Sequence, residues 1–254
     1  MVYETLTATA EEGIGKLTLN QPEKLNPLGS NTLKEIAEAT RWFDQENVPV
    51  VIVTGNGRAF SAGFDLREFA NPNHDGRNGA ALGKEMADAI ENMDAVSIAA
   101  VHGHCIGGGV VLVGACDMRI AASNTSFAIP EVDLGIPLAW GGIPRLVREI
   151  GPAMTRELVM TCRPFNAQEA KSIGFINRVV DLENLEQEAL NLATDIKNRP
   201  QSVIRTTKRQ VQSAAEDLAS TQSEWIGEVL IAAASQDKEA KESAQNYLKG
   251  KGDS

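Results

Sequence analysis

The sequence is poor in several residue types, and each shortage excludes a class of protein. Cysteine occurs three times, at widely spaced positions and without a C-x-x-C pair, so we expect neither a disulfide framework nor a cysteine zinc site. Histidine also occurs three times, and His102 and His104 have only Cys105 beside them, which is too few ligands for a metal centre. The sequence therefore predicts no metal and a reducing compartment, the cytoplasm.

Long apolar runs and excess positive charge are also missing. No stretch of about 18 uncharged apolar residues occurs, so no membrane-spanning helix is expected. The first nine residues hold no basic segment followed by an apolar one, so no secretory signal is expected. The 24 Lys and Arg are outnumbered by 34 Asp and Glu, and a net charge of −10 disfavours binding to nucleic acid or an anionic membrane. What is present is a chain of 254 residues, 43% of them apolar, which suffices for a large core.

The order of the apolar segments predicts an α/β fold. In chain order we expect two strands within 3–19, a helix over 32–45, a strand over 49–54, a helix over 80–93 and a strand over 96–101. A short strand over 117–121 follows, and from about 142 onward we expect mostly helices, apart from a short strand near 177–180. The continuous apolar run at 49–54 is typical of a strand buried on both faces. Alternating strands and helices predict an α/β core, followed by a helical C-terminal region.

The most informative segment is a glycine-rich turn between a predicted strand and a predicted helix. Residues 107–109 are all glycine and open an apolar helix. The first N–H groups of a helix have no partner inside it and attract negative charge. The spacing does not fit the dinucleotide pattern G-x-G-x-x-G, and the Lys of a P-loop is missing. Two interpretations remain: close packing of helix and sheet, or an oxyanion site made of backbone N–H groups.

Two other segments bear on catalysis. Ala62 lies in a second glycine turn after a buried strand and offers another backbone N–H, and oxyanion sites usually use two donors. Glu131 is flanked by apolar residues, which fits either an exposed charge or a buried carboxylate that acts as acid or base. Ser61 and Cys105 are weak candidates for a nucleophile because neither has a recognisable base partner.

Together these segments resemble the enoyl-CoA hydratase/isomerase family, the crotonase superfamily. The matching motifs are NQPEKLNPL at 20–28, AFSAGFDL at 59–66, GHCIGGG at 103–109, Pro130–Glu131, and Gly141–Gly142 ahead of Arg145–Leu146. Their order and spacing match over roughly residues 3–250. The resemblance implies a crotonase (ClpP-like) spiral of ββα units over 1–195, with a helical region over 196–254 for trimerisation and pocket cover. It also implies a homotrimer or dimer of trimers, an acyl-CoA thioester as substrate, and no separate cofactor.

The resemblance implies site residues as well. It assigns the two oxyanion donors to the backbone N–H groups of Ala62 and Gly108, and the catalytic base to Glu131. It places Lys24 against a CoA phosphate. Asp65 is expected to be a helix cap and not a catalyst. The full set implied to bind substrate is Lys24, Leu25, Leu28, Ala62, Gly63, Phe64, Asp65, Leu66, Gly107, Gly108, Val111, Pro130 and Trp140.

Departures from the family pattern bear on the reaction. Family hydratases use two glutamates, and the position of the first is Val111, whose side chain forms no hydrogen bonds. Dienoyl-CoA isomerases and dehalogenases carry an aspartate where this chain has Ala139. Trp140 replaces a small residue and is expected to narrow the acyl pocket. One carboxylate suffices to move a proton from C2 to C4 of a 3-enoyl thioester. The favoured reaction is double-bond isomerisation. The alternatives are hydration, thioester hydrolysis, decarboxylation, C–C cleavage, and acyl-CoA binding without catalysis.

Overall fold

A six-stranded sheet forms the centre of the computed structural model, which describes residues 1–69, 76–222, 225–234 and 236–252. The strands lie in the order β1-β2-β3-β4-β6-β9; β1 and β2 are antiparallel and the remaining neighbours are parallel. Their bounds are Leu6–Glu11, Ile14–Leu19, Val50–Gly55, Val96–Val101, Met118–Ala122 and Arg178–Val180. The strands expected within 3–19 and over 49–54 and 96–101 are thus confirmed.

A second, three-stranded sheet was not predicted. It consists of β5 (His104–Ile106), β7 (Ser126–Ala128) and β8 (Phe165–Asn166), in the order β5-β7-β8. β5, β7 and β8 have two or three residues, too few to show an apolar periodicity, so they were not predicted. This small sheet carries the chain from the large sheet to the glycine-rich turn.

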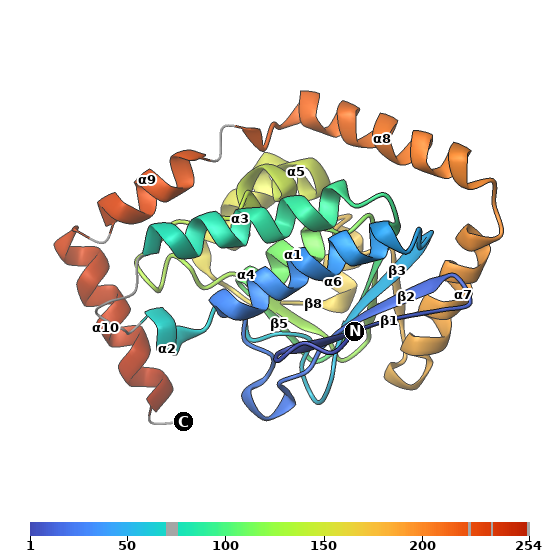
Figure 1. Cartoon of the computed structure of the whole chain (residues 1–254). Helices are drawn as coiled ribbons and strands as arrows, with labels where there is room; N and C mark the ends of the chain where they lie inside the picture. Colours follow the sequence, from blue (N-terminus) through green and yellow to red (C-terminus); the bar gives the residue numbers. More distant parts are fainter. Residues whose placement is uncertain (70–75, 223–224, 235, 253–254) are drawn as a thin grey trace.

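Helices cover both faces of the large sheet (Figure 1). They are α1 (Ser30–Gln45), α2 (Leu66–Phe69), α3 (Gly76–Asn92), α4 (Gly108–Ala115), α5 (Gly142–Thr161), α6 (Ala167–Ser172), α7 (Leu185–Lys197), α8 (Gln201–Leu218), α9 (Trp225–Ala234) and α10 (Lys238–Gly252), with 3-10 turns at Pro22–Lys24 and Leu182–Asn184. In Figure 1, α8 runs across the top of the molecule from α7 to α9, and α10 lies at the end far from α7. The mixed α/β fold and the helical C-terminal region agree with the sequence.

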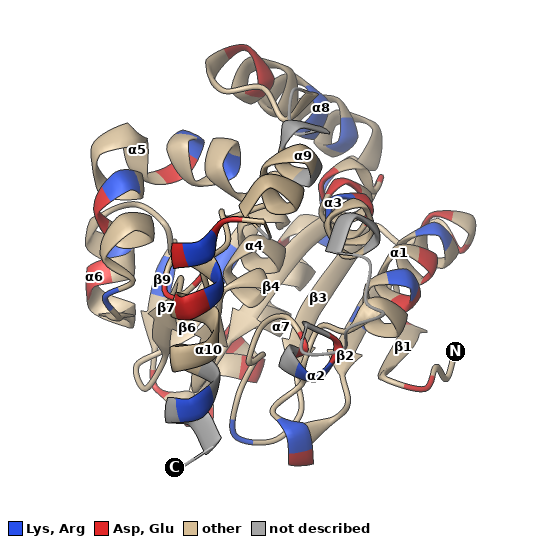
Figure 2. Ribbon diagram, turned by 90° about the vertical axis from the view of Figure 1, so that its left-hand side faces the viewer, with Lys and Arg blue, Asp and Glu red and all other residues tan. Residues whose placement is uncertain are grey.

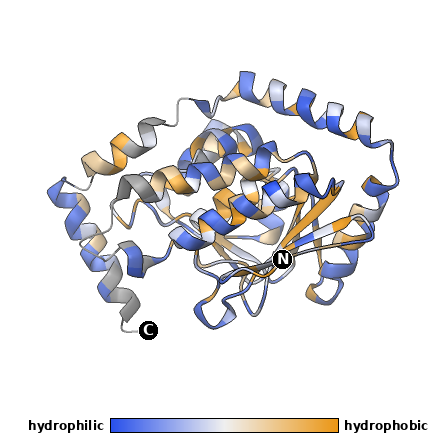
Figure 3. Cartoon of the chain, in the orientation of Figure 1, coloured by the Kyte–Doolittle hydropathy of each residue, from blue (hydrophilic) through white to orange (hydrophobic). Residues whose placement is uncertain are grey.

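The alternation of side chains along β3 explains why this strand is apolar throughout. Val51 and Val53 belong to the core shared with α1, α3 and α4, whereas Val50 and Ile52 pack on the opposite face with Ala189 of α7. Successive side chains of a strand point to opposite faces, so a strand covered on both sides needs apolar residues at every position. Figure 3 shows hydrophobic colour concentrated in the strands beneath the helices.

The surface is charged, except along part of the C-terminal region. Figure 2 shows Lys, Arg, Asp and Glu spread over the helices, while the central strands β3 and β4 carry none. Large apolar side chains on α8 and α9 are about half or more exposed to solvent: Val203, Val211, Leu218, Val229 and Leu230. No helix in the described residues is long and apolar enough to cross a membrane.

Candidate active site

Two glycine turns from distant parts of the chain lie side by side. The Ser61 N–H donates to the His104 carbonyl and the Ile106 N–H donates to the Ser61 carbonyl, both at 3.0 Å, so residue 61 adds to β5 as a short bridge. Gly63 then turns the chain with a φ of +84°, and a Cβ there would lie 2.5 Å from the Ile106 carbonyl oxygen and 3.5 Å from the Gly108 nitrogen. The close approach requires glycine and places the second turn against the start of α4.

The Gly108 N–H is available to a ligand. It opens α4 after Gly107, whose own N–H donates to the Ala128 carbonyl at 2.8 Å. Within the described part of the chain the Gly108 N–H has no hydrogen-bond partner, as expected for the first donor of a helix. The structure thus leaves this amide free to serve as the oxyanion donor assigned to it.

The expectation for Ala62 is corrected by the structure. Its N–H donates to the Leu25 carbonyl at 2.8 Å, so this amide holds two loops together and is not directed at a ligand. Ala62 also does not line the pocket described below, whereas Phe64, two residues further on, does. Phe64 is among the residues that the resemblance implies to bind substrate, whereas the donor role was assigned to Ala62.

Glu131 is a buried carboxylate with an unpartnered oxygen. Its side chain is 9% exposed, and its Oε2 has no hydrogen-bond partner among the described residues. A Cβ on Gly107 would lie 2.5 Å from Oε1, so the carboxylate packs directly on that glycine beside the start of α4. Burial raises the pKa of Glu131 to about 7, although its own backbone N–H acts in the opposite direction. A carboxyl group with a raised pKa can both accept and donate a proton near neutral pH, as a general acid–base requires.

A small apolar pocket connects these groups. Its cavity volume is about 70 Å³, and the lining residues are Phe64, Gly79, Ala80, Gly108, Val111, Glu131, Ile136, Pro137, Leu138, Ala139, Trp140 and Ile231. Glu131 is the single titratable side chain in this set. Val111 occupies the position at which the family's hydratases have their other glutamate, and it is 3% exposed. The pocket combines one amide donor, one carboxylate and apolar walls.

Half of the pocket wall was not anticipated from the motifs. Gly79 and Ala80 come from α3, Ile231 from α9, and Ile136 to Leu138 from the loop after Glu131. These residues are ordinary apolar or small residues with no distinctive spacing. Only the packing of α9 against α3 and the path of the loop bring them together, so the sequence held no signal for them.

The predicted CoA segment at residues 24–28 lies beside the glycine turn but does not line this pocket. The Leu28 N–H donates to the Gly63 carbonyl at 2.8 Å, and the Leu28 side chain is fully buried. Leu28 is therefore a core residue and not a ligand contact, which corrects the expectation. Lys24 is exposed at the surface, 4.0 Å from Glu23, so its assignment to a phosphate stays a prediction.

Asp65 is a helix cap, as expected. Its Oδ1 accepts from the Arg67 N–H at 3.0 Å, and the Arg67 guanidinium pairs with the same carboxylate at 2.7 Å, which lowers the pKa of Asp65. Leu66 begins α2, and its side chain lies outside the described part. Asp65, Gly107 and Pro130 are not among the residues that line the cavity, although Gly107 supports the Glu131 carboxylate.

The weak nucleophile candidates have structural surroundings. The Ser61 hydroxyl donates to the Asn26 carbonyl at 2.8 Å and accepts from the Gly63 N–H at 3.1 Å. Burial raises the pKa of the Cys105 thiol well above its usual range, so it remains protonated. His102 contacts the Gly57 carbonyl at 2.9 Å and His104 is exposed. Within the described ranges no three His, Cys, Asp or Glu side chains are grouped to hold a metal ion.

The C-terminal helix α10 lies over the turn that carries Glu131. The Ser243 hydroxyl donates to the Asp133 carbonyl at 2.9 Å, and a Cβ on Gly135 would collide with the backbone of Ala240. Tyr247 is half-buried on the same helix, and burial together with the neighbouring Glu131 carboxylate raises its pKa. The helix thus limits access of solvent to this side of the site.

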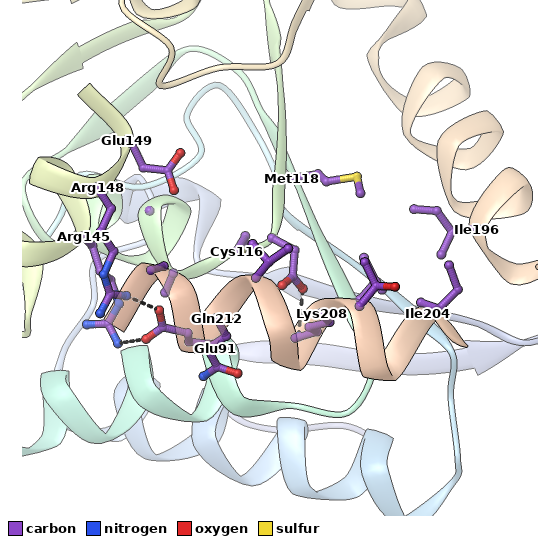
Figure 4. Close-up of a pocket in the computed structure, with 17 residues that line it drawn as sticks. Glu91, Cys116, Met118, Arg145, Arg148, Glu149, Ile196, Ile204, Lys208 and Gln212 are labelled. Atoms are coloured by element: carbon purple, nitrogen blue, oxygen red, sulfur yellow. Dashed lines mark hydrogen bonds and ion pairs between the residues drawn. The ribbon is translucent and has the colours of Figure 1, made fainter. Parts of the chain in front are cut away.

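A larger cavity of about 260 Å³ lies beneath α8 (Figure 4). Its charged side chains pair with one another: Arg145 and Arg148 with Glu91 at 2.5 and 2.7 Å, and Lys208 with Asp117 at 2.8 Å. Burial raises the pKa of the Cys116 thiol there to about 12. This cavity therefore offers neither a free charge nor an ionised nucleophile, and we place the active site in the smaller pocket.

A mostly parallel sheet, two adjoining glycine turns and a buried carboxylate beside an apolar pocket fit the class that the sequence resembles, acyl-CoA enzymes with the crotonase fold. The chain belongs to the enoyl-CoA hydratase/isomerase family, whose model matches residues 9–253. It is 40% identical over 211 residues to crotonyl-CoA hydratase of Syntrophomonas wolfei, covering 82% of this chain and 81% of the relative. It is 35% identical over 225 residues to a short-chain-enoyl-CoA hydratase of Clostridium acetobutylicum, covering 86% of each.

The solved structures agree with this assignment. An enoyl-CoA hydratase/isomerase from Xanthobacter autotrophicus Py2 superposes with a TM-score of 0.85 at 30% identity, covering 92% of this chain and 88% of the other. Pseudomonas aeruginosa DspI superposes with a TM-score of 0.81 at 29% identity, covering 84% and 88%. The fold implied by the resemblance is thereby confirmed.

Proposed function

We propose that this enzyme shifts the double bond of an enoyl-CoA thioester, with Glu131 as the single acid–base group. The observation that supports this reaction is that, among the described residues that line the pocket, Glu131 is the one with a titratable side chain, and Val111 stands where a second carboxylate would be. A hydratase has to orient and deprotonate a water molecule, and two carboxylates do this in the family pattern. An isomerase only has to move one proton between two carbons, for which one carboxylate suffices.

The proton shuttle is balanced within the substrate. The Glu131 carboxylate removes a proton from C2 of a 3-enoyl thioester, and the electron pair moves into a dienolate whose negative charge rests on the thioester oxygen. Glu131 then returns the same proton to C4, which leaves the conjugated 2-enoyl thioester. Because burial raises its pKa to about 7, the carboxylate is a stronger base than an exposed glutamate and still gives the proton back.

The dienolate oxygen needs backbone donors. We assign one to the Gly108 N–H at the start of α4, where the helix also presents partial positive charge. We assign the second to the Phe64 amide in place of Ala62, because Phe64 lines the pocket and follows the glycine that abuts Gly108. Donors of this kind contribute about 3 kcal/mol each to the stabilisation of an oxyanion.

Hydration of a 2-enoyl thioester is the second candidate reaction. The relatives from Syntrophomonas wolfei and Clostridium acetobutylicum are named as hydratases. In this chain a water molecule would be activated by Glu131 alone. One experiment separates the two candidates: incubate the protein with 2-enoyl-, 3-enoyl- and 3-hydroxyacyl-CoA of four carbons and identify the products by mass and by absorbance of the conjugated thioester.

Isomerisation of a 3-enoyl thioester leaves the mass unchanged and creates the conjugated chromophore. Hydration of a 2-enoyl thioester adds the mass of one water and destroys that chromophore. Glu131→Gln is expected to abolish turnover while acyl-CoA binding remains. Asp133→Asn is the matched control, because Asp133 is an exposed carboxylate on the same turn. Rapid hydration by the wild type, faster than isomerisation, would refute the isomerase proposal. Equal activity of Glu131→Gln and wild type would refute a catalytic role for Glu131.

The exposed apolar side chains on α8 and α9 are large enough in number to require cover, and we propose that region 196–254 buries them in a homotrimer. Lys24 is proposed to contact a phosphate of CoA, because it is exposed beside the loop that abuts the glycine turn. Chain 1–195 then supplies the catalytic groups.

A further inference from the structure

Trp140 fills the space between two helices next to the catalytic groups. A Cβ built on Gly83 of α3 would fall inside the indole, and one built on Gly108 of α4 would overlap its benzo edge. The ring therefore lies flat against one glycine and touches the other. It also packs edge-on to Phe64, with ring centroids 6.0 Å apart and planes at 83°. Each helix has a glycine where it contacts the indole, because a larger residue at either position would clash with the ring.

The backbone at Trp140 is held in a costly conformation by a buried arginine. Trp140 has a φ of +62°, which disfavours a residue with a Cβ, and its carbonyl accepts from Arg145 Nη1 at 3.0 Å. Arg145 is 2% exposed and pairs with Asp88 at 2.9 Å and with Glu91 at 2.5 Å, both on α3. Figure 4 shows the arginine directed at Glu91. The arginine thus fixes the turn to the same helix on which the indole lies.

The room left beside the indole is small. A cavity of about 70 Å³ holds about five groups the size of a water molecule, since each needs about 10–15 Å³ by this measure. An acyl group of four carbons with its carbonyl oxygen has five heavy atoms. Longer chains have to displace a ring that is 8% exposed and lies against Gly83 with its face and against Gly108 with its benzo edge.

We infer that Trp140 is a specificity-determining residue that restricts the enzyme to short acyl chains, and that Arg145 positions it. This inference rests on the proposed function, because it takes the pocket to be the acyl site. It goes further by naming the substrate class as acyl groups of about four or five carbons. Gly83 and Gly108 leave room for the indole, and Arg145 holds the backbone of Trp140, so the four residues act together.

The test compares enoyl-CoA substrates of four, six, eight and ten carbons in wild type, Trp140→Ala and Trp140→Phe. The readout is the ratio of kcat/KM for eight carbons to that for four. Wild type is expected to give a low ratio, and Trp140→Ala to raise it by about tenfold or more, because each newly buried methylene contributes about fourfold. Trp140→Phe should give an intermediate ratio. Trp42→Ala, which removes an indole from α1, is the matched control and should leave the ratio unchanged.

Arg145→Lys tests the positioning role, because lysine keeps the charge but loses the planar fork of donors. A raised ratio supports positioning, whereas an unchanged ratio shows that Arg145 serves the fold alone. If wild type turns over four- and ten-carbon substrates equally well, or if Trp140→Ala leaves the ratio unchanged, the specificity inference is overturned while the proposed function stands. If neither the wild type nor any variant turns over an acyl-CoA, the proposed function itself is refuted, and the specificity inference falls with it.

Discussion

Replacing Gly83 with alanine should couple strongly to the tryptophan that lies on it. In a helix interior, Gly→Ala by itself stabilises by about 0.5–1 kcal/mol. Here the added methyl group would fall inside the Trp140 indole, whereas an ordinary Cβ contact is 3.4–4 Å. Overpacking of this kind costs about 1–3 kcal/mol. The two contributions predict that Gly83→Ala destabilises the wild-type protein by about 1–2 kcal/mol.

The sign should reverse once the indole is removed. In a Trp140→Ala background nothing opposes the new methyl group, so Gly83→Ala should recover the helix-propensity gain of about 0.5–1 kcal/mol. The interaction energy between the two sites is therefore about 2–3 kcal/mol, although Trp140→Ala alone costs about 3–5 kcal/mol. Urea unfolding of the four proteins, followed by circular dichroism at one fixed protein concentration, measures this cycle.

A matched control exists in the neighbouring helix. A Cβ on Gly114 of α4 would lie 3.8 Å from the Phe175 ring, an ordinary contact, so Gly114→Ala should be neutral or mildly stabilising in both backgrounds. The reasoning is refuted if Gly83→Ala changes the free energy of unfolding equally with and without the indole. An interaction energy below about 0.5 kcal/mol would mean that the ring does not lie on Gly83.

Three further outcomes are expected. The pKa of Glu131 is about 7 in the folded protein and 4.5 in its ordinary range, so between these pH values the native state binds more protons than the unfolded chain. The free energy of unfolding therefore falls as the pH rises through this interval. Urea denaturation should show Glu131→Gln to be more stable than wild type by up to about 3 kcal/mol at pH 8 and equally stable at pH 4. A Glu131→Gln protein less stable than wild type at pH 8 would contradict this. Val111→Glu should raise hydration of 2-enoyl-CoA by about 100-fold by supplying a second carboxylate, with Val111→Gln as control, and an unchanged rate would mean that position 111 does not reach the substrate. Leu218→Asp should dissociate the proposed trimer, measured by light scattering, whereas Ser213→Asp, an exposed position on α8, should not; a mass unaffected by Leu218→Asp would contradict the proposed interface.

The sequence predicted the strands of the large sheet, including the short β9, but it missed the three strands of the small sheet, for a physical reason. Runs such as 49–54 and 96–101 are almost entirely apolar because both faces of the sheet are covered, with Thr54 and Ser97 as the polar exceptions. β5, β7 and β8 have three residues or fewer, and their pairing is determined by segments far away in the chain. Ile231 reaches the pocket in the same way, through the packing of α9 on α3.

The residue types of the site could be predicted from the sequence, but the directions in which their N–H groups and side chains point could not. Several features of the site follow from residue identity and spacing, which do not depend on the fold. They are the glycines of both turns, Glu131, the absence of a carboxylate at Val111 and the large side chain of Trp140. Which amide turns toward the pocket depends on where the neighbouring carbonyls lie: the Leu25 carbonyl takes the Ala62 N–H. The raised pKa of Glu131 likewise requires packing that removes water.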